Sequence, residues 1–539
     1  MDLDREKRRQ AIHVIISDSL IAFFVVVIVV VLLAIVIGYR INSDFSLEQN
    51  GLVQLQTVPS NATVIIDGET ELGHTKLSKM LPGGEHEVVL QRDGYEEWRK
   101  TITVTPGWLL RVEYPRLIKQ DRETRDMIEF GERDLDFFYA SPSRKYALYS
   151  LDHSTEWHFV SGFGNNNLKD SVIDITGIFS TEVEVVKDNT KVIEGEEVKV
   201  DETPEYLFTG KIKSIEWNDL ETAVLLKVSD GENEEWGVID FANPTESVNL
   251  SSELTRYESN YKNLDDKEPR SEKNTGSAAT VKQAAVATKK IKANQISDAR
   301  FETTDKIFVV VNGNLREVSL TKKTAMSTEI NDIAEFENYE DQVVYVTTKK
   351  NGACEIRLYR MGDEKSVLVQ EVGAEKSSVL VSVTKYGGQS YLEYFIDNRL
   401  YVYRSVEFPH QGQKISLMVK IAENDTSITP SGRLAVSPNG MVVIARDGNK
   451  LASFENEMEQ LSEYEYGSSR MVWFDPYILA DVTEKGELMI RDFDGANLRK
   501  LSVKGAAAGY DQLVAPNNKY FYYIVRNADD ELMLRRESL

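Results

Sequence analysis

Ser141-Pro142-Ser143-Arg144-Lys145-Tyr146-Ala147-Leu148-Tyr149 is a polar turn that runs straight into an apolar strand. The same order returns near the C-terminus in residues 515–523 (APNNKYFYY), and residues 437–444 (SPNGMVVI) are a third copy. Proline with Ser, Asn or Gly favours a turn, and a run of aromatic and β-branched residues favours a strand. From about residue 118 onward, the chain is therefore predicted to repeat one turn-and-strand unit.

Weaker copies of this turn, mostly without the proline, precede five more apolar runs. They are residues 217–219, 301–303, 336–338, 386–388 and 474–476, and most lead on to a second strand. Units of about 35–50 residues with period-two alternation are typical of a β-propeller, and we count about eight of them. The fold predicted for residues 118–539 is a seven- or eight-bladed β-propeller. An array of β-sandwiches or a β-solenoid is the alternative.

The last unit ends with residues 531–535 and lacks an outer strand. We predict that residues 126–130 (DMIEF) supply it, because this would close the ring and remove an exposed sheet edge. The units resemble the WD-repeat-like propellers of the Tol-associated periplasmic protein family, whose blades carry similar Ser-Pro-Asp/Asn-Gly turns. The resemblance covers nearly the whole of residues 118–539 and implies a propeller.

An uncharged run near the N-terminus, residues 19–39, predicts a membrane-spanning helix. Its centre, Leu20 to Gly38, reads LIAFFVVVIVVVLLAIVIG, nearly long enough to cross a hydrocarbon layer of about 30 Å as a helix at about 1.5 Å per residue. Four basic residues precede it and one, Arg40, follows before Lys76, which predicts a cytoplasmic tail (1–19) and an external remainder. A cleaved signal peptide has a shorter apolar stretch and a small-residue cleavage site, and the sequence has neither.

After a linker of residues 39–50, a small β-domain is predicted for residues 51–117. Short apolar runs with turn pairs such as Asp67-Gly68 and Pro106-Gly107 between them indicate strands. The glycines of these pairs are explained by turn geometry alone.

The order of turns in this β-domain resembles a known family. VPSNATVIIDG (residues 58–68) is followed by Gly73-x-Thr75, by LPGG-x-His (residues 81–86) and by Gly94-Tyr95. This order is similar to that of the PEGA domain, a small β-sandwich of bacterial and archaeal surface proteins. The signature here reads PSNA (residues 59–62), and Lys76 stands where a proline is usual. The resemblance implies an extracytoplasmic adhesion or spacer module and carries no catalytic residue across.

Two insertions interrupt the repeats. Residues 181–205 hold nine acids and three lysines among valines, and we predict a protruding acidic hairpin. Residues 258–294 are rich in Ser, Ala, Lys and Asn, which is typical of a mobile loop. The second half, residues 276–294, holds four lysines and no acid. It is either a basic arm for an anionic polymer or a solvated linker.

The net charge of −24 lies outside the membrane, because the four acids and four bases of the tail cancel. Such a surface repels nucleic acid and favours solubility or basic partners. The single cysteine, Cys354, excludes an internal disulfide. It alternates with Ile356 and Leu358 in a strand-like run, which places the three side chains on the same face, so we expect Cys354 to face the core.

The sequence contains no pattern of known catalytic chemistry. It lacks G-x-S-x-G, a Walker loop, H-E-x-x-H and a CxxC pair. His153 and His158, with Asp152 and Glu156, form the one tempting metal cluster, but ordinary loop histidines explain them better. Residues 492–497 (DFDGAN) start like a calcium loop but lack the downstream glutamate, so a blade turn is the better interpretation. We predict no catalytic, cofactor-binding or metal-binding residues.

Together these patterns predict an all-β protein apart from one N-terminal transmembrane helix. The function predicted is that of a membrane-anchored, extracytoplasmic binding or scaffold protein of the prokaryotic envelope. Its expected partners are an envelope protein or a cell-wall polymer bound on a propeller face, and the two insertions are expected to border that face. The alternatives are an envelope hydrolase or lyase on a propeller scaffold, and a subunit of an envelope assembly or secretion complex.

Overall fold

The computed structural model describes residues 18–33, 39–41, 47–185, 190–193, 196–199, 205–265, 296–328, 330–349, 351–373, 378–467, 471–501 and 505–539. Residues 18–33 are helical, but within the described ranges no helix is both long and apolar enough to cross a membrane. The predicted spanning segment, Leu20 to Gly38, includes residues 34–38, which lie outside the described residues. The chain divides into two compact units, with the boundary between Arg122 and Glu123.

The described residues of the first unit form two four-stranded sheets. One is formed by β1 (Tyr39–Ile41), β2 (Leu47–Leu55), β5 (Leu77–Pro82) and β8 (Leu109–Val112). The other is formed by β4 (Glu69–His74), β3 (Thr63–Ile66), β6 (Gly84–Gln91) and β7 (Trp98–Val104). Strands β2 and β7 approach closely at Gly51, where an added Cβ would lie 2.6 Å from Val104 Cγ1. Alternating residues such as Val53, Leu55 and Val64 are buried, as two facing sheets require.

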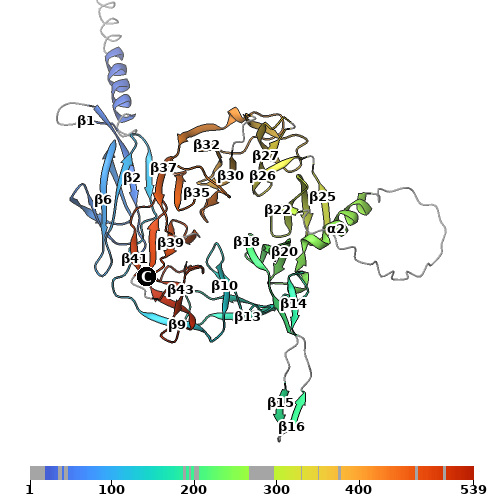
Figure 1. Ribbon diagram of the computed structural model, residues 1–539. Coiled ribbons are helices and arrows are strands. Elements are labelled where there is room, and N and C mark those ends of the chain that lie inside the picture. The colour runs from blue at the N-terminus through green and yellow to red at the C-terminus, as the bar shows by residue number, and fades with distance from the viewer. Residues whose placement is uncertain are drawn as a thin grey trace, which may run out of the picture. The chain divides into compact units, whose positions relative to one another are not determined.

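The second unit contains eight four-stranded antiparallel sheets among its described residues, arranged in a ring (Figure 1). We number these blades in chain order. Blades 1 to 4 comprise β10 (Leu135–Ala140), β11 (Tyr146–Leu151), β12 (Glu156–Ser161), β13 (Lys169–Asp174); β18 (Lys211–Trp217), β19 (Ala223–Ser229), β20 (Glu234–Asp240), β21 (Val248–Asn249); β22 (Ile296–Phe301), β23 (Lys306–Val311), β24 (Asn314–Ser319), β25 (Thr324–Ser327); β26 (Ile333–Tyr339), β27 (Gln342–Thr348), β28 (Cys354–Arg360) and β29 (Val367–Val372).

Blades 5 to 8 comprise β30 (Val379–Tyr386), β31 (Gln389–Ile396), β32 (Arg399–Ser405), β33 (Val419–Asp425); β34 (Ala435–Val436), β35 (Val442–Asp447), β36 (Lys450–Glu455), β37 (Gln460–Glu465); β38 (Val472–Asp475), β39 (Ile478–Val482), β40 (Leu488–Asp492), β41 (Arg499–Leu501); β42 (Leu513–Val514), β43 (Tyr520–Arg526), β44 (Leu532–Ser538) and β9 (Thr124–Gly131). Two short 3-10 helices, Pro244–Glu246 and Ile415–Leu417, lie in connections.

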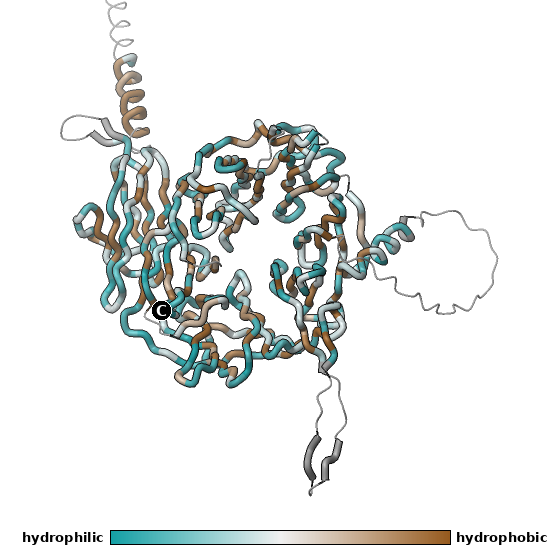
Figure 2. The backbone as a smooth tube through the Cα atoms, in the orientation of Figure 1, coloured by the Kyte–Doolittle hydropathy of each residue, from teal (hydrophilic) through white to brown (hydrophobic). Residues whose placement is uncertain are grey.

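The ring is closed by β9, which pairs with β44 and supplies the outer strand of blade 8. This confirms the closing strand that was predicted from residues 126–130. Asp126 and Arg535 form a two-point ion pair across the seam, with N–O distances of 2.6 and 3.2 Å. The apolar core lies between neighbouring blades, and one cluster spans blades 8 and 1. In Figure 2 the hydrophobic residues accordingly recur in the strands of every blade.

The three sequence copies that predicted the repeat adopt the same turn. In each, the backbone N–H of the first residue donates to the carbonyl five residues later: Ser141 to Tyr146 at 2.9 Å, Ser437 to Val442 at 2.9 Å and Ala515 to Tyr520 at 2.8 Å. The fourth residue of each has positive φ, at 64°, 73° and 56° for Arg144, Gly440 and Asn518. All three turns join the first and second strands of a blade, so they lie at the same end of the ring.

The two insertions both leave the outer strand of one blade and enter the first strand of the next. The acidic insertion contains two nested strand pairs, β14 (Glu182–Val185) with β17 (Glu205–Phe208) and β15 (Thr190–Ile193) with β16 (Glu196–Lys199), which confirms the predicted hairpin. The second prediction was partly wrong. Residues 258–265, predicted as loop, belong to helix α2 (Leu250–Asp265), whose Leu254 and Tyr257 are buried in the core between blades 2 and 3. The rest of that prediction, residues 266–294, lies outside the described residues.

Candidate functional site

The innermost strands of blades 1 to 4 share an irregularity near their start. Their register shifts by one residue at Asp136, Lys213, Ser297 and Ala334 in β10, β18, β22 and β26, respectively. A β-bulge turns the strand and changes where the following side chains point. After the bulge, Ala299 of β22 and Phe336 of β26 are buried in the blade cores. Alternation therefore places their neighbours on the opposite face, toward the propeller axis.

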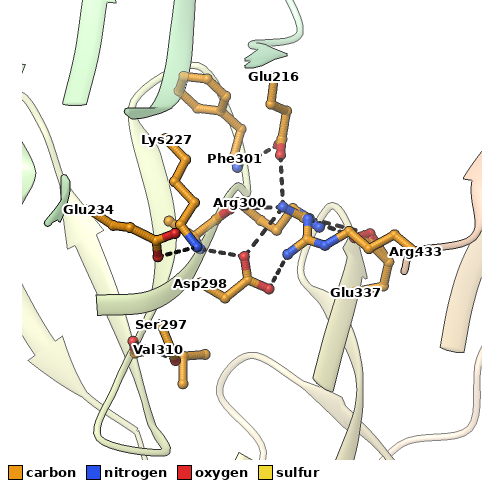
Figure 3. A network of polar contacts seen from close by, with 11 residues as sticks. Glu216, Lys227, Glu234, Ser297, Asp298, Arg300, Phe301, Val310, Glu337 and Arg433 are labelled. Atoms are coloured by element: carbon orange, nitrogen blue, oxygen red, sulfur yellow. Dashed lines mark hydrogen bonds and ion pairs between the residues drawn. The ribbon is translucent and has the colours of Figure 1, made fainter. Parts of the chain in front are cut away.

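These axial neighbours are charged, and they form a network centred on Arg300 (Figure 3). Arg300 Nε lies 2.6 Å from Glu337 Oε1 in the next blade. Arg300 Nη1 lies 3.5 Å from Glu216 Oε2 in the preceding blade and 3.6 Å from Asp298 Oδ1. The side chain of Arg300 is only 9% exposed, so one guanidinium balances several carboxylates in a nearly closed space.

A second arginine reaches this network from across the ring. Arg433, in the connection that enters blade 6, pairs with Asp298 and lies 3.9 Å from Glu337 Oε1. Beside them, Lys227 pairs with Glu234 at 2.7 Å. We call Glu216, Asp298, Arg300, Glu337 and Arg433 the axial network. It links blades 2, 3, 4 and 6 through side chains, although their strands do not hydrogen-bond to one another.

A cavity of about 410 Å³ opens next to the axial network. Its lining combines charged side chains with apolar ones, the latter including Trp236, Val310 and Ile333. The charged lining residues are Lys213, Lys227, Asp298, Glu335 and Arg433. The indole of Trp236 is 3% exposed, and its Nε1–H has no hydrogen-bond acceptor among the described residues. A buried donor without a partner normally costs stability, but this atom has almost no accessible surface, so it is the ring of Trp236 that contributes to the lining.

The carboxyl groups around the cavity are hard to ionise. Burial raises the pKa of Glu216 to about 7, although the charge of Arg300 opposes the shift. Burial, followed by the negative charges of Asp298 and Glu337, raises the pKa of Glu335 to about 7. In the described part of the chain Glu335 has no ion-pair partner, whereas Asp298 and Glu337 each have arginines. Glu335 is thus the carboxyl group that a cationic ligand would stabilise most.

The axial network was not predicted from the sequence. Glu216, Arg300 and Glu337 occupy equivalent positions, four residues after the isoleucines Ile212, Ile296 and Ile333, which are the first or second residues of three innermost strands. A charged residue that recurs four positions after an isoleucine in three strands was the signal that could have found it.

The tempting histidine cluster is not assembled. His153 Nδ1 lies 2.8 Å from Asp136, and His158 Nδ1 lies 3.1 Å from Asp170 and stacks on Tyr149. No group of three or more possible metal ligands occurs within the described ranges.

The other two sequence candidates have structural roles. Cys354 is half-buried and packs against the core of blades 4 and 5. Residues 492–497 form the turn after β40, in which Gly495 N–H donates to the Asp492 carbonyl at 2.9 Å, as the blade-turn interpretation expected.

Comparison with known families identifies part of the first unit. Residues 50–116 match the PEGA domain family. Residues 50–116 are a PEGA domain. The residues that carried the resemblance lie at its turns, with residues 59–62 between β2 and β3 and residues 82–84 where β5 passes into β6. In the PEGA domain, His86 Nδ1 lies 2.6 Å from Asp67 Oδ2, and this hydrogen bond lowers the pKa of Asp67.

The solved structures similar to the chain include a WD40 domain, a propeller and an enzyme. The C-terminal WD40 domain of Sif2 is 9% identical, with a TM-score of 0.40 over 77% of this chain and 98% of that chain. The Dos1 propeller is 11% identical, with a TM-score of 0.39 over 77% and 95%. Oligogalacturonate lyase from Vibrio parahaemolyticus is 9% identical, with a TM-score of 0.34 over 77% and 98%. No curated protein sequence matches the chain. The propeller fold after the PEGA domain therefore rests on its own eight sheets and their closure.

Proposed function

We propose that this chain is a membrane-anchored, extracytoplasmic binding or scaffold protein of the prokaryotic envelope, and that its propeller binds a cationic group of a partner protein in the axial cavity. The anchor is supported by residues 20–33, whose large apolar side chains are all exposed and which Figure 2 shows as hydrophobic along the helix. The basic residues before this run and the scarcity of bases after it favour a cytoplasmic N-terminus.

The observation that carries the binding proposal is Glu335. It lines a cavity of about 410 Å³ without a counter-ion among the described residues, beside two carboxylates that arginines already neutralise. A lysine or arginine side chain entering there would pair with Glu335, with which the described lining residues Lys213, Lys227 and Arg433 form no ion pair. The net charge of −24 also favours basic partners at longer range. A cavity of this volume accommodates one side chain and its neighbours rather than a polymer strand.

The connections that contain the two insertions enter the propeller at the end where the cavity lies. The residues that line the cavity lie near the starts of β18, β22 and β26, and the connections that contain the insertions lead into β18 and β22. We therefore expect the insertions, of which residues 266–294 lie outside the described residues, to border the face on which a partner would bind.

A hydrolase or lyase on the propeller scaffold is the second candidate, favoured by the convergence of Glu335 and Asp298 on one cavity. A carboxyl group that titrates near neutral pH suits general acid–base catalysis. However, Asp298 is held by Arg433 and Arg300, which is how a structural ion-pair network uses a carboxylate. We therefore favour binding.

Full-length protein titrated with a lysine-rich peptide tests this function. Glu335→Gln should weaken binding about tenfold or more at pH 8, because an ion pair in a poorly solvated site contributes on the order of 1–3 kcal/mol. Binding to the unaltered protein should weaken below about pH 7, as Glu335 takes up its proton. Glu484→Gln, an exposed residue in a turn at the same end, is the matched control and should leave binding unchanged. Equal affinities for all three proteins would refute the axial site, and cleavage of an added envelope glycan that Glu335→Gln abolishes would favour the enzyme.

The anchor is tested separately by topology. A reporter fused after Leu539 should be active only outside the cytoplasm, and protease added to spheroplasts should digest the chain beyond about residue 40. Protection of the C-terminal part would contradict the proposed location.

A further inference from the structure

The β7–β8 turn of the PEGA domain exposes two large apolar side chains. Trp108 is 56% exposed and Leu109 is 39% exposed. The other five tryptophans of the chain are buried or half-buried. A tryptophan presented to solvent at the tip of a turn is unfavourable in water and calls for a partner surface.

This turn forms an uncharged tip on the domain. Residues 101–110 (TITVTPGWLL) contain no charged side chain, although 28% of the chain is charged. The turn at residues 82–84 (PGG) lies against it, because a Cβ added to Gly83 would lie 2.5 Å from Pro106 Cγ. We call residues 82–84 and 105–109 the apolar tip. Both turns are exposed, so the tip is a small apolar surface without a charged residue in either turn.

The apolar tip lies at the end of the domain where the chain arrives from the N-terminal apolar run. Tyr39 pairs with Gln49 across β1 and β2. A Cβ added to Gly107 would lie 2.5 Å from Gln49 Nε2, and Gly107 N–H donates to the Asn50 carbonyl at 3.0 Å. Tyr39, which directly follows Gly38, and the tip are therefore both neighbours of one residue, Gln49.

We propose that the apolar tip, through Trp108 and Leu109, inserts into the interfacial region of the lipid bilayer. This inference rests on the proposed membrane anchor. If residues 20–38 span the membrane, Tyr39 leaves the bilayer at its outer surface, and no length of chain remains to hold the tip away from it. Tryptophan prefers the headgroup level, where its ring is partly in hydrocarbon and its N–H remains hydrated. The tip also has no carboxylate that anionic headgroups would repel.

Quenching of tryptophan fluorescence by brominated lipid tests this contact. Full-length protein is reconstituted into vesicles of phosphatidylcholine and phosphatidylglycerol, with bromine atoms near the headgroup end of the acyl chains. We expect a minor fraction of the emission to be quenched, since one tryptophan in six lies at the tip. Trp108→Phe should remove the quenching and leave the remaining emission unaltered.

A tryptophan placed elsewhere on the same domain provides the control. Leu72 in β4 is fully exposed. It lies between Thr70, which pairs with Ile65, and His74, which pairs with Thr63, and this part of β3 lies beside the Gln91 end of β6. The tip adjoins the Gly84 end of β6, on the order of 20 Å away along the strand. Leu72→Trp in a Trp108→Phe background should therefore show no quenching.

The outcomes separate the tip from the anchor. Quenching that depends on Trp108 and is absent for Leu72→Trp supports the inference. Protein that floats with the vesicles but shows no Trp108-dependent quenching overturns the inference and leaves the anchor standing. Protein that fails to float with the vesicles overturns the anchor and, with it, the contact at the tip.

Discussion

Glu393 of β31 is a carboxyl group with no exposed surface. Thr384 Oγ1 donates to Glu393 Oε1 at 2.8 Å, and Asn456 Nδ2 donates to the same oxygen at 3.2 Å, which joins blades 5 and 6. Burial raises the pKa of Glu393 to about 7, against about 4.3 in an unfolded chain. Between these values the folded state binds a proton that the unfolded state has lost. The free energy of unfolding therefore falls as pH rises through this window.

Glu393→Gln should remove this pH dependence. Glutamine keeps an acceptor oxygen for both donors and never ionises. The variant should be more stable than the parent by ~1–3 kcal/mol at pH 8 and nearly equally stable at about pH 4, below the unfolded pKa. Urea denaturation at the two pH values measures the difference. Equal stabilities at pH 8 would show that Glu393 ionises without cost.

Gly440 shows how one residue of the repeated turn is fixed by its neighbour. Its φ is +73°, and a Cβ would lie 2.5 Å from the Lys385 carbonyl oxygen of the preceding blade. Gly448 also has positive φ, +57°, but nothing lies within 4 Å of its Cβ position. Gly440→Ala should cost ~2–4 kcal/mol of unfolding free energy, and Gly448→Ala ~1 kcal/mol. Thermal unfolding of both variants checks the order, and a reversal would mean that the two blades do not meet at this turn.

At the scale of elements, α2 shows where composition misled the sequence analysis. Only its second half, residues 258–265, was predicted as loop, from its Ser, Asn and Lys content. That half continues a helix whose preceding residues Leu250, Leu254 and Tyr257 recur at helical spacing and are buried between blades 2 and 3. The helix also begins with a cap, since Ser252 N–H donates to Asn249 Oδ1 at 3.1 Å. Three buried residues outweigh a polar majority, because burial of one face is enough to hold a helix on a surface.

Leu254→Ala should destabilise the propeller by ~2–4 kcal/mol, since it leaves a cavity between the helix and the two blades. Thr255→Ala, which changes the exposed neighbouring position, should change the free energy of unfolding by less than ~0.5 kcal/mol. Chemical denaturation distinguishes the two. A negligible effect of Leu254→Ala would mean that α2 frays from the blades without cost.

The blade strands were largely predictable because their pattern is local, with a turn, an apolar strand and a second turn. The axial network was not. The ion pairs of Arg300 can be predicted only when the packing of blades 2, 3 and 4 is known, because its partners Glu216 and Glu337 are distant in sequence. The bulges that aim these side chains have no distinctive residue either, as Asp136, Lys213, Ser297 and Ala334 have nothing in common.

At the scale of the whole molecule, the closing strand β9 decides whether the ring is one cooperative structure. It covers the outer edge of β44 and buries Phe130 in the core between blades 8 and 1. A chain that starts at Glu123 keeps this strand, and one that starts at Glu132 lacks it.

We expect the fragment 123–539 to be monomeric and to unfold cooperatively, and the fragment 132–539 to aggregate or to lose several kcal/mol of stability. The reason is that an open edge strand offers unpaired backbone groups to other chains. Light scattering and denaturation of the two fragments provide the measurement. Equal behaviour would show that the ring is held together without its seam.

The pairing of β9 with β44 also determines when the ring can close during translation. The two strands that close the ring are separated by roughly 400 residues, from Gly131 to Leu532. At a translation rate of about 5–20 residues per second, the first strand emerges some 20–80 s before its partner exists. During that interval every nascent chain carries an unpaired β-edge at its start and an incomplete ring behind it. The exposure ends only when β44 has been made, so a ribosome that stalls before Leu532 would leave all the other blade strands synthesised and the ring still open.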